Sequence, residues 1–226
     1  MSDVVSNEDT ERYQLPSKGE KSFARTNPQT IVQRANLITK LLPGTMSIAE
    51  ICCGDCTHQW MTYLHLAGAK RFRGLDYEPF IVAQNHSRGI DCVRGDAIDP
   101  LTMLQFMSFD VIFYGPPLSI DCDGHQLLEF GQVRPRYADF SRMIWCDLAY
   151  EGTLVCICPR TTTMGDISAL YQQVRKSNQN AGLRMIHHSY STVTGRGEAT
   201  PLRLKYIELW FSTRLEDLWE VHRNES

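Results

Sequence analysis

The sequence predicts an α/β fold in which a mainly parallel sheet carries helices on both faces. Apolar, strand-like runs alternate with helical patterns from residue 28 to residue 178. The run at 152–158 is apolar almost throughout, as is typical of a central parallel strand. A short connection at 194–201 joins the last two expected strands, which indicates an antiparallel hairpin at one edge.

The first helix is expected from Pro28 to Leu42. Asn27 supplies a capping side chain directly before Pro28, and proline is favoured at the first helical position. Pro43-Gly44 ends the helix. Further helices are expected at 57–67, 79–87, 100–107, 137–149 and 166–178, and strands at 47–52, 71–76, 90–93, 110–114, 152–158, 184–192 and 202–212.

The pattern predicts one folded domain, with no internal repeat. Residues 1–27 are polar and lack periodicity, so we expect a flexible tail or a lid there and the domain over residues 28–226. The length of 226 residues suits a single α/β domain.

Composition limits the possible partners. The formal charge of −3 disfavours binding of nucleic acid by bulk electrostatics, although a local basic patch remains compatible with it. No apolar run reaches the roughly 18 residues that a membrane span needs, so we expect a cytoplasmic protein with no membrane partner.

Eight cysteines raise the question of disulfides or metal. Cys52, Cys156 and Cys158 lie in apolar, strand-like runs, where cysteine behaves as a small hydrophobic residue. Cys53 and Cys56 form a CxxC, but no second CxxC completes a zinc site. We expect reduced thiols and no metal, and a cysteine-based metal or redox protein stays as an alternative.

Possible ligand-binding residues follow the expected strands. The first strand ends in Glu50-Ile51-Cys52-Cys53-Gly54-Asp55-Cys56, an acidic residue and a tight turn before a helix. Asp76-Tyr77 follows the second strand and Asp96-Ala97 the third. Because parallel strands end at the same edge of a sheet, these residues are expected around one cleft.

The fourth strand ends in Tyr114-Gly115-Pro116-Pro117-Leu118, a turn that begins an irregular stretch from Leu118 to Pro135. Asp121 and His125 follow this turn closely. Either residue is a candidate general base, and His125 is the first choice.

In order and spacing, these segments resemble the class I S-adenosylmethionine (SAM)-dependent methyltransferases over about residues 28–212. The resemblance implies a Rossmann-like, seven-stranded sheet and SAM as the cofactor. It implies cofactor contacts from Glu50, Cys52, Gly54, Cys56, Asp76, Tyr77, Asp96, Ala97 and Tyr114. In this family, Asp76 would accept hydrogen bonds from the ribose hydroxyls, Tyr77 would pack on adenine and Asp96 would bind its amino group.

The turn after the fourth strand resembles the Asn/Asp-Pro-Pro-Tyr motif of amino-group methyltransferases, in a degenerate form. Gly115 replaces the polar residue and Leu118 the aromatic one, while Pro116 and Pro117 match. Likewise, Cys52 and Cys56 stand where the family has glycines around Gly54. The catalytic set that the resemblance and the turn suggest is Gly115, Pro116, Pro117, Asp121 and His125.

The expected activity is methyl transfer, favoured toward a nitrogen of a nucleic-acid base, a protein amide or amine, or a small-molecule amine. Small-molecule O- or C-methylation is one alternative. A SAM-binding partner or scaffold without catalysis is another, since four positions depart from the family pattern.

Overall fold

The computed structural model describes residues 28–118, 128–145, 152–190 and 203–214. Within them, seven strands form one sheet in the order β3-β2-β1-β4-β5-β7-β6. Strand β7 is antiparallel to both β5 and β6, whereas the other neighbours are parallel. The predicted parallel sheet with a C-terminal antiparallel hairpin is therefore confirmed. The strands are β1 Ser47–Ile51, β2 Arg71–Asp76, β3 Cys92–Arg94, β4 Val111–Tyr114, β5 Thr153–Pro159, β6 Gly182–Tyr190 and β7 Arg203–Ser212.

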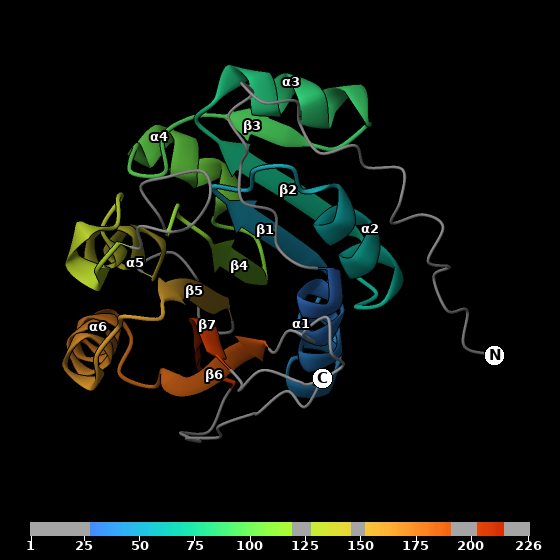
Figure 1. Cartoon of the computed structure of the whole chain (residues 1–226). Helices are drawn as coiled ribbons and strands as arrows, with labels where there is room; N and C mark the ends of the chain where they lie inside the picture. Colours follow the sequence, from blue (N-terminus) through green and yellow to red (C-terminus); the bar gives the residue numbers. More distant parts are fainter. Residues whose placement is uncertain (1–27, 119–127, 146–151, 191–202, 215–226) are drawn as a thin grey trace, which may run out of the picture.

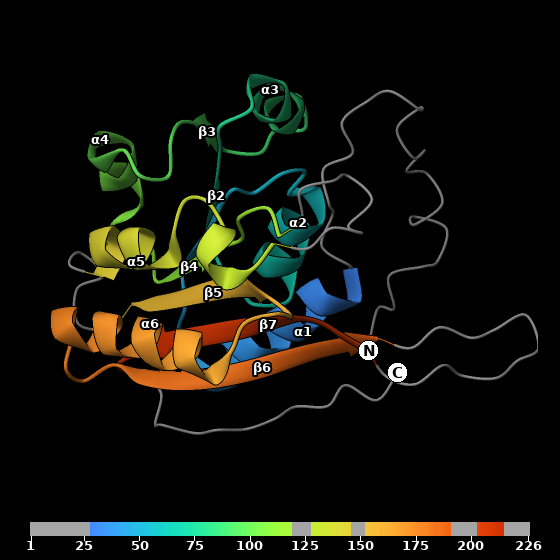
Figure 2. The ribbon, with the colours of Figure 1, turned by 60° about the vertical axis from the view of Figure 1, so that its left-hand side comes forward.

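Helices cover both faces of the sheet, as predicted (Figures 1 and 2). Alternate residues of β4 enter two separate cores: Phe113 packs with Ile38 of α1, and Ile112 packs with Phe140 of α5. Helices α1 Pro28–Leu41, α2 Thr57–His65 and α3 Pro79–Ser87 lie on the first face, and α4 Pro100–Met103, α5 Tyr137–Trp145 and α6 Met164–Ser177 on the second. None of the helices in these described segments is long and apolar enough to span a membrane.

Two expected segments differ from the structure in the type of element that they form, whereas the bounds of the others shift by at most two residues within the described residues. The helix expected at 100–107 is only the four-residue α4, and a 3-10 turn continues it over Leu104–Phe106. This tighter turn is accompanied by burial of both Phe106 and Phe109, whose ring centroids lie 5.9 Å apart. Within the stretch expected to be irregular, Phe130–Gln132 forms a second short 3-10 helix.

The strand order reverses beside β1, the point at which open α/β sheets form a ligand-binding crevice. The chain builds β1, β2 and β3 in one direction and then crosses back to place β4 on the other side of β1. At such a reversal, the connections that leave neighbouring strands diverge, and ligands of α/β proteins bind there. The loops that follow β1, β2, β3 and β4 all reach this edge, because these strands are parallel.

A buried ionic cluster joins the first helix to the sheet. Nε of Arg34 on α1 donates to Glu208 on β7 over 2.6 Å, and both side chains are essentially inaccessible. The indole N–H of Trp210 also donates to Glu208, over 3.0 Å. Nη1 of Arg34 lies 3.7 Å from Glu50 on β1, so one guanidinium serves two carboxylates.

We predict that Arg34→Met lowers the free energy of unfolding by about 3–5 kcal/mol, because it leaves the buried carboxylate of Glu208 without a counter-charge. Adding Glu208→Gln should recover part of this loss. Urea unfolding followed by tryptophan fluorescence measures both variants. Arg73→Met is the matched control, since it breaks an exposed pair with Asp91 and should cost about 1 kcal/mol or less. A loss of that size for Arg34→Met would contradict the role of the cluster.

Candidate functional site: the crevice at the carboxyl ends of β1 to β4

The loop after β1, residues 52–56, is bent by two residues with left-handed backbone. Cys52 has φ of 59° and Gly54 has φ of 56°, a conformation that side chains disfavour and glycine tolerates. A Cβ added to Gly54 would meet no atom within 4 Å in the structure. The backbone of Gly54 is therefore open to a neighbouring group on the side where a Cβ would lie.

Asp76, at the end of β2, fixes this loop. One of its carboxylate oxygens accepts a 2.9 Å hydrogen bond from the N–H of Gly54, and the other accepts from the N–H of Glu78 over 3.0 Å. Cys53 adds a backbone bond, from its N–H to the carbonyl of Leu75. The carboxylate thus lies at the crevice, with its oxygens held by two loops.

The structure brings Cys52, Asp76 and Asp96 together. Burial, together with the negative charges of Asp76 and Asp96, raises the pKa of the Cys52 thiol to about 12. Cys52 and Asp96 lie in the loops after β1 and β3, and Asp76 is the last residue of β2, so these three lie at the same edge of the sheet. Glu50, which was expected with them, has its side chain elsewhere. Asp96 is exposed and accepts a 3.0 Å hydrogen bond from the N–H of Ile98.

Tyr77 lies at the outer end of the crevice. Its side chain is 67% exposed, and that of Phe80, at the start of α3, is 66% exposed. Ala97 is buried beneath the loop after β3, where it packs in the second core. An exposed aromatic ring and a small buried residue therefore border the outer part of the site.

The side chain of Glu50 lies in the buried ionic cluster on the α1–α2 side of the sheet. Its carboxylate accepts a 3.0 Å hydrogen bond from the hydroxyl of Tyr63, beside Arg34. Burial raises the pKa of Glu50 to about 7, although Arg34 and Tyr63 oppose the shift. Any influence of Glu50 on the crevice therefore passes through the backbone of β1.

Two other expected cofactor residues also have buried side chains. Cys56 is fully buried at the start of α2 and packs in the first core. Tyr114 stacks on Phe140, with ring centroids 3.8 Å apart, and its hydroxyl donates to the carbonyl of Pro135. Only the backbone of Cys56 and Tyr114 is available to a ligand. The sequence pattern placed both residues at the cofactor but did not show that their side chains are buried.

The turn after β4 forms the other side of the crevice. The N–H of Gly115 donates to the carbonyl of Ile51 over 3.0 Å, which places this turn beside the end of β1. Pro116 is buried and Pro117 exposed. The candidate bases Asp121 and His125, like the expected tail or lid at 1–27, lie outside the described residues.

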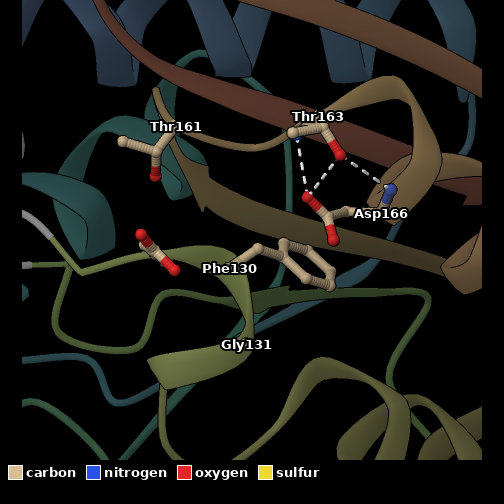
Figure 3. Close-up of a pocket in the computed structure, with 6 residues that line it drawn as sticks. Phe130, Gly131, Thr161, Thr163 and Asp166 are labelled. Carbon is tan, nitrogen blue, oxygen red and sulfur yellow. Dashed lines mark hydrogen bonds between the residues drawn. The ribbon is translucent and has the colours of Figure 1, made fainter.

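A small cavity lies beyond this turn, next to the end of β5 (Figure 3). The N–H of Leu128 donates to the carbonyl of Leu118, and the hydroxyl of Thr161 donates to the carbonyl of Leu128, so the cavity adjoins the Pro-Pro turn. Its volume is about 270 Å³. The lining residues are Glu129, Phe130, Gly131, Thr161, Thr163 and Asp166.

Two residues that support the site were missed in the sequence. Asn85 of α3 is fully buried, and its amide donates to the carbonyl of Gly54 over 2.8 Å. Arg88 donates to Asp55 over 2.7 Å and to the hydroxyl of Thr57 over 2.8 Å. Hydrogen bonds from Thr57 and Arg88 to Asp55 outweigh the effect of burial and lower the pKa of Asp55. Neither residue belongs to a recognisable motif, because Asn85 on α3 and Arg88 directly after it contact a loop that is distant in sequence.

Solved structures that share this fold include methyltransferases. The precorrin-6y C5,15-methyltransferase from Geobacter metallireducens GS-15 has a TM-score of 0.55 and 11% identity, over 90% of this chain and 95% of that one. The SAM-dependent methyltransferase from Agrobacterium tumefaciens has a TM-score of 0.60 and 9% identity, over 84% of this chain and 63% of that one.

The plantazolicin methyltransferase BamL, solved with a triazolic desmethylPZN analog and SAH, has a TM-score of 0.56 and 12% identity. The alignment covers 83% of this chain and 84% of that one. No protein-family model matches the chain, and no curated protein sequence does. At such identities, the likeness establishes the fold, a Rossmann-like methyltransferase sheet.

The pKa of Glu50 predicts a pH dependence of stability. In the native state Glu50 keeps its proton up to about pH 7, whereas in the unfolded state it loses the proton near its ordinary pKa of 4.5. Between these two pH values the native state binds more protons than the unfolded state, so the free energy of unfolding falls as pH rises. The contribution is roughly 3 kcal/mol. We expect Glu50→Gln, which resembles the protonated form, to gain stability relative to the wild type between pH 5 and pH 8.

Urea unfolding of both proteins at the two pH values tests this expectation. Glu129→Gln serves as a control for the substitution itself, because it removes an exposed carboxylate. An identical pH dependence in the wild type and Glu50→Gln would show that Glu50 is ionised in the fold throughout this range.

Proposed function

We propose that this protein is a SAM-dependent methyltransferase that uses the crevice between β1, β2 and β4. The observation that carries the proposal is the meeting of Cys52, Asp76 and Asp96 beside the open space over Gly54. An adenosine requires acceptors for its ribose hydroxyls and amino group, together with close approach to backbone, and these residues offer both. The shared fold with solved methyltransferases supports the same reading.

Each residue has a definite task in this proposal. The carboxylate of Asp76 accepts hydrogen bonds from the ribose hydroxyls while the N–H groups of Gly54 and Glu78 hold it in place. Tyr77 covers the adenine, and Asp96 accepts from its amino group beside the small Ala97. When bound, SAM supplies an electrophilic methyl group on a sulfonium.

The acceptor would enter from the side of β4 and β5. Gly115 and Pro116 border the crevice there, and the 270 Å³ cavity adjoins the Pro-Pro turn. Glu129, Thr161 and Asp166 line this cavity and carry oxygen atoms that can accept hydrogen bonds, which suits a group that donates them, such as an amine. These features and the Pro-Pro turn favour a nitrogen acceptor.

Catalysis would rest mainly on positioning. Carbonyl groups of the turn at 115–118 would orient an N–H group toward the cofactor, and holding two reactants in such a geometry is a large part of the rate enhancement in transfer reactions. For a hydroxyl or amide acceptor, His125 or Asp121 would remove the proton.

A second candidate is a SAM-binding partner protein without turnover. Gly115 and Leu118 lack the side chains that hold a target amino group in the amino-group enzymes, and Cys52 adds a Cβ where a glycine is usual. Isothermal titration with SAM, followed by a methyl-release assay on cell extract, separates the candidates. Binding with turnover supports the enzyme, and binding without turnover supports the partner.

We predict that Asp76→Ala weakens SAM binding by about 10-fold or more, because it removes a charge-assisted acceptor for the ribose. Asp76→Asn should lose less, since it retains one acceptor oxygen. Isothermal titration measures the affinities, and thermal unfolding checks that each variant folds.

Asp139→Ala is the control for the loss of an acidic residue, because Asp139 is exposed on α5. It should bind SAM as the wild type does. An unchanged affinity in Asp76→Ala would remove Asp76 from the ribose role, and a wild type that binds no SAM would refute the proposed function.

A further inference from the structure

We propose that Cys53 and Cys92 form an oxidisable pair, and that a disulfide between them switches off cofactor binding by displacing the β1–α2 loop. The two sulfur atoms lie 3.7 Å apart, although Cys53 follows β1 and Cys92 begins β3, on opposite sides of β2. The regulatory part of this inference rests on the proposed function. The pairing of the thiols does not.

Gly74 makes the contact between the two thiols possible. It lies on β2 between them, paired with Glu50 of β1 and with Cys92 of β3. A Cβ at this position would come within 2.8 Å of the Cys53 sulfur and 3.3 Å of the Cys92 sulfur. With any other residue here the sulfurs would be pushed apart, so glycine lets thiols from two non-adjacent strands meet across the strand between them.

The pair is connected directly to the proposed cofactor site. Cys53 precedes Gly54, whose N–H donates to Asp76 and whose carbonyl accepts from Asn85. The same amide nitrogen of Asn85 lies 3.8 Å from the Cys53 sulfur and 3.7 Å from that of Cys92. One buried side chain therefore touches both thiols and the loop that would hold the cofactor.

Disulfide formation would strain this arrangement. The sulfurs must come about 1.6 Å closer than they lie, to reach the S–S bond length of about 2.05 Å. Cys92 is held in β3, whereas Cys53 lies in a loop. Movement of Cys53 toward Cys92 would carry Gly54 with it and weaken the hydrogen bond to Asp76.

The two thiols have different surroundings. Hydrogen bonding from Cys53 and from Asn85 lowers the pKa of Cys92. Hydrogen bonding to Cys56 and Cys92, together with burial, raises the pKa of Cys53. Because the two sulfurs lie 3.7 Å apart, whichever thiol reacts with an oxidant has the other beside it to resolve the product.

Hydrogen peroxide is the class of oxidant that suits the site, because Cys53 is only 6% exposed and Cys92 only 2%. The thiolate of one cysteine attacks one peroxide oxygen, the O–O bond breaks, and hydroxide leaves and takes up a proton. The sulfur of the other cysteine then attacks the sulfenic acid so formed, and its S–O bond breaks. A second water leaves with the proton of the second thiol, so two thiols are oxidised as one peroxide is reduced.

Metal binding is a weaker reading of these cysteines. No three His, Cys, Asp or Glu side chains in the described part of the chain are grouped so as to hold a metal ion. The contact between the Cys53 and Cys92 sulfurs is what a disulfide requires of the structure, with peroxide as the oxidant.

Peptide mapping of the full-length protein tests the pair. Reduced protein is treated with hydrogen peroxide, blocked with iodoacetamide and digested with trypsin without reductant. Trypsin places Cys52, Cys53 and Cys56 in peptide Leu41–Lys70 and Cys92 in Gly89–Arg94. We expect these two peptides to be linked, with the link absent in Cys53→Ala and Cys92→Ala. It should persist in the control Cys156→Ala, which removes a buried thiol of the other core.

Isothermal titration with SAM tests the switch. Oxidation should lower the affinity at least 10-fold in the wild type and in Cys156→Ala, and dithiothreitol should restore it. Cys53→Ala and Cys92→Ala should keep their affinity after peroxide. Prior saturation with S-adenosylhomocysteine should slow the linkage, because it covers the loop at Gly54.

Failure to link the two peptides, or a Cys53–Cys56 bond that leaves Gly89–Arg94 free, would overturn the pair. Linkage with unchanged SAM affinity would overturn the switch. If the reduced wild type binds no SAM, the proposed function and the switch both fall, while the peptide map still decides the pair.

Discussion

The carboxylate of Asp76 is the interaction on which the proposed site depends. It ties the loop after β1 to the end of β2 through the N–H of Gly54, and it holds the start of α3 through the N–H of Glu78. Because charge-assisted hydrogen bonds are the strong ones, this single group gives the crevice its shape before any ligand arrives. The left-handed turn at Cys52 and Gly54 follows from the same constraint, since the chain must reverse sharply to present its N–H to Asp76.

The rest of the domain keeps this edge of the sheet rigid. Two separate cores hold the parallel strands between helix layers, and the ionic cluster of Arg34, Glu50 and Glu208 joins α1, β1 and β7 on one face. Burial of an ion pair is costly, so such a cluster is tolerated only where its geometry is well satisfied. Here it anchors β1, the strand from which the loop at 52–56 leaves.

Much of the fold was predictable because short stretches of sequence determine where strands and helices alternate, where helices are capped and where the chain turns. The helix at Pro28, the strand ending at Asp76 and the hairpin of β6 and β7 followed from such signals. Orientation of side chains was less accessible: the acidic residue at the end of a strand was expected at the crevice, but Glu50 pairs with Tyr63 beneath the sheet. Asn85 and Arg88 were missed because their roles depend on tertiary contacts across 31 and 33 residues.

A crystal structure of the protein with S-adenosylhomocysteine is the most direct test of the central claim. The account predicts the nucleoside in the crevice, with both ribose hydroxyls on Asp76 and the adenine between Tyr77 and Ala97. A nucleoside bound elsewhere on the molecule, or an empty crevice at millimolar ligand, would contradict it.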